Sequence, residues 1–274
     1  MGGVMDNTKT VQFPPSSYMT FMDKLHGYIE LHEQAIKREQ AKTPNVVFEI
    51  GSKSRRLKRD GSVVLMPREF GYLFSALNEF IDNPHRLPEL YTWGGEMMNN
   101  RESRRISAQI QMVLLSNCEL EGGRIGRATS AGMKTISYKK IQEDYALRFG
   151  EILHESTLLR HMKALYHAGY FHSERINVVV EKNNGTIRSA ASFKQLTSIY
   201  FNDLKVSRYP NIIELIKAST QRQKDKGLLL TWIPIRRIAK GIQEVFNAAK
   251  MDQFAQTTAN IFHAHSATPN LSPP

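Results

Sequence analysis

The chain has 274 residues, and 41% of them are hydrophobic, which is enough to bury a sizeable core and excludes a wholly disordered protein. Its 37 lysines and arginines against 26 acidic residues give a net charge of +11, so nucleic acid is the expected partner, with a solubility charge or a ribosome- or lipid-associated protein as the alternatives. With no run of eighteen apolar residues, no secretory signal and one cysteine, Cys118, we expect a cytoplasmic protein without a membrane span or an internal disulfide.

The N-terminal part of the sequence predicts a long helix followed by a basic hairpin. Residues 1–17 are expected to be a flexible arm, and a helical apolar period covers 18–41. Two β-branched runs, 46–50 and 63–66, flank a loop bounded by glycine and serine, which predicts a hairpin. We expect its tip to contact the DNA backbone, with a solvated turn or a nuclear-localisation-like run as the alternatives. The tip carries five cations within seven residues: Lys53, Arg55, Arg56, Lys58 and Arg59.

Two further helices are predicted before the middle of the chain. Pro67 opens an aromatic-rich helix, and residues 85–100 are expected to be a loop. Ser103 is the predicted N-cap of the next helix, which ends near Asn117. The region 18–120 is therefore expected to consist of helices and a hairpin, with a first winged-helix-like unit as the alternative.

The segment 121–134 is predicted to be a glycine-rich, basic loop that does not bind ATP. Its GRATSAGMKT sequence has five residues between the glycines, and Met133 separates Gly132 from Lys134, so the amides and the lysine of a phosphate-binding loop are not in place. Scattered histidines and carboxylates form no catalytic or metal-binding pattern, and a His-Ala-His pair near the C-terminus has no tyrosine nucleophile after it. We expect no enzymatic activity, no metal and no cofactor.

The densest pattern of the chain predicts a helix-turn-helix with a hairpin. Ser137 is the predicted cap of one helix, and STLLRHMKALYHAGYF (156–171) predicts a second helix that stops at Gly169. Two extended runs then flank an Asn-Asn-Gly turn at 183–185, which is a strong hairpin signal. Helix, turn, helix and hairpin is the order of a winged helix-turn-helix, which we assign to 121–205 as the DNA-binding domain.

The two helices of this unit have apolar and polar faces. Six apolar positions are spaced to face the core: Ile141, Tyr145, Leu147, Leu158, Met162 and Leu165. On the polar side, Arg160 suits bidentate contact with guanine and Lys163 suits a phosphate, although a merely solvated face is the alternative. The candidate DNA contacts of this unit, including two on the hairpin, are Tyr138, Lys139, Lys140, Ser156, Thr157, Arg160, His161, Lys163, Lys182 and Arg188.

The remainder of the chain is expected to be mostly helical. Apolar patterns predict helices over 193–203, 211–218 and 235–250, so that 206–250 forms a C-terminal helical region. The last segment, 251–274, is expected to be a disordered tail. The whole chain is therefore predicted to be mainly α-helical with small β-hairpins, an α+β fold.

Three segments resemble the RepA-type replication initiators of theta-replicating plasmids, in particular those of the FII incompatibility group. They are FMDKLHGYI (21–29), the run from ISYKKIQ through STLLRHMKALYHAGYF (136–171), and SFKQLTSIYFNDLKVS (192–207). The resemblance implies a non-enzymatic initiator that binds its plasmid's origin and recruits host replication proteins, with base or backbone contacts from Thr157, Arg160 and Lys163. The chain departs from the family at its C-terminus, which is neutral and rich in Thr, Asn and Pro where the family has an arginine-rich region.

Together these features predict a sequence-specific double-stranded DNA-binding protein, with initiation and copy control of plasmid replication as the leading function. A winged-helix transcriptional regulator is one alternative. An alternative of another class is a protein-interaction scaffold that does not bind DNA. The expected partners are plasmid origin DNA and host replication proteins, and a homodimer is left open because no heptad or interface stripe occurs in the sequence.

Overall fold

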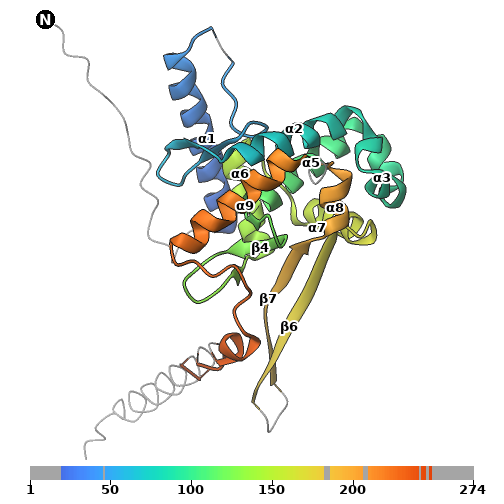
Figure 1. The fold of residues 1–274 in the computed structure, drawn as a ribbon. Helices are drawn as coiled ribbons and strands as arrows, with labels where there is room; N and C mark the ends of the chain where they lie inside the picture. The colour runs from blue at the N-terminus through green and yellow to red at the C-terminus, as the bar shows by residue number, and fades with distance from the viewer. Residues whose placement is uncertain are drawn as a thin grey trace, which may run out of the picture.

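The structure is a computed structural model, and it describes residues 20–45, 47–181, 186–205, 209–240, 242–244 and 247–248. Helices predominate and are joined by small antiparallel sheets, so the predicted α+β class is confirmed (Figure 1). The elements are α1 (Phe21–Lys42), β1 (Arg55–Leu57), β2 (Val63–Leu65), α2 (Arg68–Asp82), η1 (Pro84–Arg86), α3 (Pro88–Gly94), α4 (Glu96–Asn99), α5 (Arg101–Ser116), β3 (Cys118–Glu119), β4 (Arg124–Arg127), β5 (Lys134–Thr135), α6 (Tyr138–Phe149), α7 (Glu155–His167), β6 (Phe171–Glu181), β7 (Thr186–Leu196), α8 (Ser198–Asp203) and α9 (Pro210–Asp225).

Helix α1 begins with a capping box and packs against α6. The Thr20 hydroxyl accepts a hydrogen bond from the Asp23 amide at 3.1 Å, and the Asp23 carboxylate accepts one from the Thr20 amide, also at 3.1 Å. The buried face of α1 contributes to a small apolar cluster with α6 through Leu25, Tyr28 and Ala35. The N-terminal helix is therefore fixed to the element that precedes α7.

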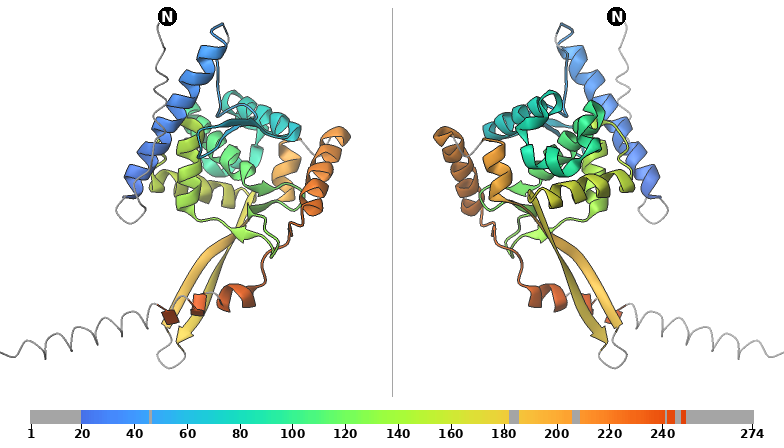
Figure 2. Two further views of the ribbon diagram at one scale, coloured as in Figure 1. Left: turned by 90° about the vertical axis from the view of Figure 1, so that its left-hand side faces the viewer. Right: turned by 90° about the vertical axis from the view of Figure 1, so that its right-hand side faces the viewer.

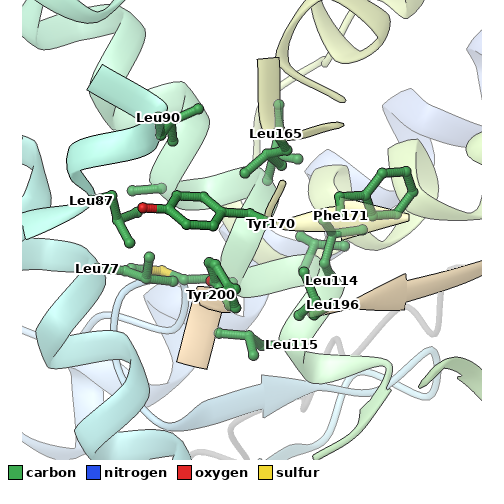
Figure 3. Packing of buried hydrophobic residues seen from close by; sticks show 14 of the residues in the cluster. Leu77, Leu87, Leu90, Leu114, Leu115, Leu165, Tyr170, Phe171, Leu196 and Tyr200 are labelled. Carbon is green, nitrogen blue, oxygen red and sulfur yellow. The ribbon is translucent and has the colours of Figure 1, made fainter. Parts of the chain in front are cut away.

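The main apolar core joins the helices α2, α5 and α7 to the start of the β6–β7 hairpin. Figure 3 shows the ring of Tyr170 in this core, with Leu90 on one side and Tyr200 on the other. The two tyrosine rings lie 5.7 Å apart between centroids, at 63°. The Tyr170 hydroxyl accepts a hydrogen bond from the Glu89 amide at 3.2 Å and donates one to the Asp203 carboxylate at 2.6 Å. One side chain thus connects α3, the hairpin and α8.

The larger sheet has the strand order β3–β4–β7–β6, and β5 pairs with β4. Strands β6 and β7 pair antiparallel from Phe171 and Leu196 outward and project well beyond the helices α1 to α9 (Figures 1 and 2). Strand β4 pairs with the base of β7 through Arg124 and Gln195. The turn before β4 approaches β7 so closely that a Cβ on Gly123, which has a φ of +70°, would lie 2.1 Å from the Leu196 carbonyl oxygen. Only glycine fits there.

Most elements predicted for the second half of the chain are confirmed. Ser137 caps α6, Gly169 follows α7 with a φ of +69°, and the hairpin strands flank the expected turn. The six apolar positions predicted to face the core between residues 141 and 165 are all buried. The hairpin is longer than predicted: β7 continues to Leu196, and the helix expected over 193–203 begins only at Ser198, after its Thr197 cap.

Several boundaries predicted for the first half are wrong. Residues 47–50 form no strand, because Phe48 and Ile50 pack into the cluster between α1 and α6, and β2 pairs instead with β1. The expected loop at 85–100 contains most of η1 and all of α3 and α4, and three residues of this stretch are buried in the main core: Leu87, Leu90 and Met98.

The remaining differences concern caps and lengths. Helix α5 is capped by Asn100, which accepts hydrogen bonds from two amides, rather than by Ser103. The loop 121–134 contains β4 and the first residue of β5, and α9 extends beyond the predicted 211–218. The predicted arm (1–17) and tail (251–274) lie outside the described residues.

Candidate nucleic-acid interface

Two consecutive helices, α6 and α7, form the centre of the candidate interface. The Ser137 hydroxyl accepts a hydrogen bond from the Lys140 amide at 3.2 Å and caps α6, and Gly150 ends that helix with a φ of +67°. After a short turn, α7 begins at Glu155 and packs against α3, α5 and β6. The side of α7 opposite these contacts faces away from the core.

We call the exposed side of α7 its outer face. It consists of six exposed residues, most of them three or four positions apart, which places them on one side of a helix: Ser156, Leu159, Arg160, Lys163, Tyr166 and His167. Arg160 and Lys163 form no ion pair with any residue that the structure describes. The outer face therefore presents a guanidinium, an ammonium, a hydroxyl and a phenol, which can donate hydrogen bonds to base edges or phosphates.

The prediction that His161 belongs to this polar face is wrong. Its side chain is 0% exposed, and within the described part of the chain neither ring nitrogen has a hydrogen-bond partner. Burial, with a smaller contribution from the neighbouring Arg160 charge, lowers the pKa of His161 to about 4. A buried neutral imidazole cannot contact a base, and Thr157, which is half-buried, lies at the edge of the outer face.

The start of α6 offers fewer exposed cations than the sequence suggested. Lys140 forms an ion pair with Asp144 one turn along the helix. Tyr138 is half-buried, and its ring lies 4.9 Å from the Lys194 ammonium. Lys139 is exposed, with its ammonium 5.5 Å from the ring of Phe21. Of the three predicted contacts here, Lys139 is the one whose charge is accessible for a phosphate.

A buried lysine connects this region to the hairpin. Lys194 is 1% exposed, and its ammonium donates hydrogen bonds to the carbonyls of Ile136 at 2.8 Å and Ser192 at 3.1 Å. Burial lowers the pKa of Lys194 to about 8. Because Ile136 lies just before α6 and Ser192 lies on β7, the lysine fixes the start of the helix against the base of the hairpin. Sequence reasoning missed it, since strand alternation alone does not show which lysine is buried.

The β6–β7 hairpin carries the remaining predicted contacts of this unit. Lys182 lies outside the described residues, and Arg188 is placed by its backbone on β7, opposite Val178. Arg175 on β6, which was not among the predicted contacts, is exposed close to the hairpin base. The hairpin and α7 are contiguous, because α7 leads into β6 through Gly169 and Tyr170 and packs against it.

The five cations predicted at the N-terminal hairpin are placed in two groups. Arg55 lies 4.4 Å from the Phe48 ring and donates a hydrogen bond to the Glu49 carbonyl at 2.8 Å. Arg59 pairs with the Glu143 carboxylate of α6 at 2.9 Å. The other three are exposed and have no ion pair with a described residue: Lys53, Arg56 and Lys58. Lys58 and Arg59 lie in the turn between β1 and β2, as predicted, whereas Arg55 and Arg56 are part of β1 itself and Lys53 precedes that strand.

A buried arginine, Arg148, binds the backbone of the segment that leads into this hairpin. The Arg148 guanidinium donates hydrogen bonds to the carbonyls of Gly51 at 2.9 Å and Lys53 at 3.0 Å, and it lies 4.6 Å from the Phe74 ring. Burial, with a smaller contribution from Arg56, lowers the pKa of Arg148 to about 9. The segment that carries the exposed cations is thus attached to α6.

A further cationic pair appears where the sequence predicted a loop. Arg127 on β4 and Lys134 on β5 are directly opposite each other in the strand register, and both are exposed. Like charges opposite each other destabilise a strand pair, and neither forms an ion pair with a described residue. A bound phosphate would relieve that repulsion. The sequence showed both cations, but their register depends on a strand pairing that it did not reveal.

Other kinds of site find little support in the described residues. No group of three or more His, Cys, Asp or Glu side chains there could hold a metal ion. Among the same residues, no helix combines the length and the apolar character needed to cross a membrane.

No family model matches the chain, and no curated protein or solved structure matches it either.

Proposed function

We propose that this protein is a winged-helix protein that binds double-stranded DNA sequence-specifically, with α7 in the major groove and β6–β7 as the wing. The order of its elements supports this proposal: α5 is followed by the short strands β3, β4 and β5, then by the helices α6 and α7, and then by the β6–β7 hairpin. The sheet order β4–β7–β6 places the hairpin in the same sheet as β4, with β7 paired to β4 and β6 on the outer side of β7. In such a fold the first helix of the pair supports the second at the DNA.

The observation that carries the proposal is the outer face of α7. Arg160 and Lys163 are exposed there and form no ion pair with a described residue, and they lie beside the base of a projecting hairpin in a chain with a net charge of +11. An unpaired arginine can bind the two acceptors of guanine, and an unpaired lysine can bind a phosphate.

Initiation of plasmid replication is the biological role that we propose for this activity. The support comes from the resemblance of three sequence segments to the plasmid initiators and from the basic charge of the chain. On this proposal the protein acts in the cytoplasm, without enzymatic activity, and its partners are an origin and host replication proteins.

DNA binding can be tested by selecting preferred sequences from random duplexes and measuring affinities by gel shift. We expect Arg160→Ala to lose about 1–3 kcal/mol at one base position and Lys163→Ala to weaken all sequences about equally. Lys37→Ala, which removes an exposed cation from α1, is the matched control and should bind as wild type. Unchanged specific affinity in the Arg160→Ala, Lys163→Ala double variant would show that α7 is not the recognition helix.

The role in replication needs a separate test. The gene with its flanking DNA is placed on a circle that lacks another origin, and the circle is introduced into a host. Maintenance of the circle, lost when the reading frame is shifted, would support the initiator. Specific DNA binding without maintenance, but with changed transcription from a neighbouring promoter, would favour a transcriptional regulator instead. Absence of any DNA binding would favour the interaction scaffold.

A further inference from the structure

One side chain on the outer face of α7 is apolar and lies between the cations. Leu159 is 42% exposed, although the three other leucines and methionines of this helix are buried. It directly precedes Arg160 and stands one helical turn before Lys163. A single exposed leucine on an arbitrary surface is ordinary. Here it occupies the part of the helix that would enter the groove.

The chemistry of the major groove gives such a leucine one matching feature. Thymine alone among the four bases presents a methyl group there, whereas cytosine presents an amino donor beside a bare C5–H. An isobutyl side chain can bury the methyl group, but it cannot accept a hydrogen bond from the amino group of cytosine. Leucine therefore favours thymine and disfavours bases whose polar edges it would cover.

The position of Leu159 also separates its contact from that of Arg160. Consecutive residues on an α-helix point about 100° apart around the axis, so the two side chains reach different bases. Neither side chain packs into the core: Arg160 and Leu159 are both exposed, and neither is among the buried residues of α7. A guanine contact by Arg160 would leave Leu159 against a neighbouring base pair.

We propose that Leu159 is a specificity-determining residue that contacts the 5-methyl group of a thymine next to the guanine bound by Arg160. The inference rests on the proposed function, since it requires α7 to lie in the major groove. It adds a base preference that the cations alone do not provide.

The test removes the methyl group from the DNA rather than from the protein. After the preferred duplex has been selected, each thymine in it is replaced in turn by deoxyuridine, which lacks only the 5-methyl group. Wild-type protein should lose affinity about fourfold at one position, the factor expected for burying one methyl group. Leu159→Ala should bind the thymine and deoxyuridine duplexes equally at that position. Ile199→Ala, which truncates an exposed apolar residue of α8, is the matched control and should keep the wild-type preference.

The possible failures are distinguishable. If a preferred sequence is selected but no thymine methyl group affects binding, or if Leu159→Ala retains the wild-type methyl preference, this inference is overturned and the proposed function stands. If no sequence is preferred at all, the proposed function itself fails and the inference fails with it. Because Leu159 is 42% exposed, its truncation should leave the fold intact, and circular dichroism of Leu159→Ala checks this before the duplexes are compared.

Discussion

Two basic regions of the molecule look alike in the sequence and differ in the structure. At the N-terminal hairpin, Arg55 lies against the Phe48 ring and Arg59 pairs with Glu143. Buried Arg148 binds the backbone carbonyls of Gly51 and Lys53 just before the hairpin. On the outer face of α7, Arg160 and Lys163 have no ion pair with described residues. In Figures 1 and 2 the segment that joins α1 to α2 and contains β1 and β2 lies in the upper half of the molecule, and the β6–β7 hairpin lies at the lower end.

The difference shows that a count of cations does not identify a binding surface. A cation whose hydrogen bonds go to protein carbonyls or carboxylates contributes to the fold, and its removal changes stability. A cation without such partners contributes mainly to the electrostatic field, and its removal changes binding to a polyanion. The following predictions separate these two roles.

The largest effect is expected from removing Arg148. Arg148→Ala leaves the carbonyls of Gly51 and Lys53 without their donor and creates a cavity beside Phe74, so it should destabilise the protein by about 3–5 kcal/mol. Urea unfolding followed by circular dichroism measures the change. Arg56→Ala removes an exposed cation from the same hairpin and should stay within about 0.5 kcal/mol of wild type. Equal stability of the two variants would contradict the structural role of Arg148.

The buried imidazole of α7 should make stability depend on pH. The pKa of His161 is lowered to about 4 in the folded protein, so the unfolded chain, with a pKa near 6.5, takes up the proton first. Stability should therefore be full above pH 6.5 and fall as the pH drops toward 4, by up to about 3 kcal/mol.

His161→Leu should remove most of this loss and stabilise the protein at neutral pH, because two unpartnered nitrogens are no longer buried. His32, whose pKa burial also lowers, remains in the variant and acts in the same direction. Thermal unfolding between pH 4 and 7 compares the two proteins. The same pH slope in both would show that His161 is not the group responsible.

The exposed cations of the N-terminal hairpin should affect the salt dependence of DNA binding without affecting stability. If Lys53, Arg56 and Lys58 all contact phosphates, replacing them together by Gln should reduce the slope of log affinity against log salt by about 3. Affinities measured at several salt concentrations give the slope. An unchanged slope would place this hairpin away from the DNA and restrict the interface to α7 and the β6–β7 hairpin.

The smallest effect is expected from the paired cations of that hairpin. Arg59→Gln should leave the salt slope unchanged and lower stability by about 1 kcal/mol or less, since the Arg59 side chain is largely exposed and its ion pair is screened. Urea unfolding and the salt series together check this. A reduced salt slope with unchanged stability would mean that Arg59 belongs to the binding surface after all.

The sequence predicted those features that depend on local chemistry. The Ser137 cap, the Gly169 stop and the spacing of Leu158, Met162 and Leu165 each follow from rules that act within a few residues, and all are present. His161 was misplaced because α7 is covered by α3, α5 and β6, and the width of that covered surface depends on tertiary packing.

Contacts between segments that are distant in the chain could likewise not be predicted from the sequence. Lys194 and Arg148 are long cationic side chains whose partners are backbone carbonyls of distant segments, and nothing in their own neighbourhoods distinguishes them from surface residues. The opposed pair Arg127 and Lys134 depends on a strand register that the glycine-rich composition concealed.

Glu143 has a consequence for how the chain can be divided. This nearly buried carboxylate of α6 accepts ion pairs from Lys24 of α1 at 2.6 Å and from Arg59 at 2.9 Å. A fragment cut to residues 121–205 would leave it without either cation and would also remove α2 and α5 from the shared apolar core. The smallest unit that folds should therefore begin before Lys24, so that the DNA recognition proposed for α7 has to be tested in the whole protein and not in a fragment.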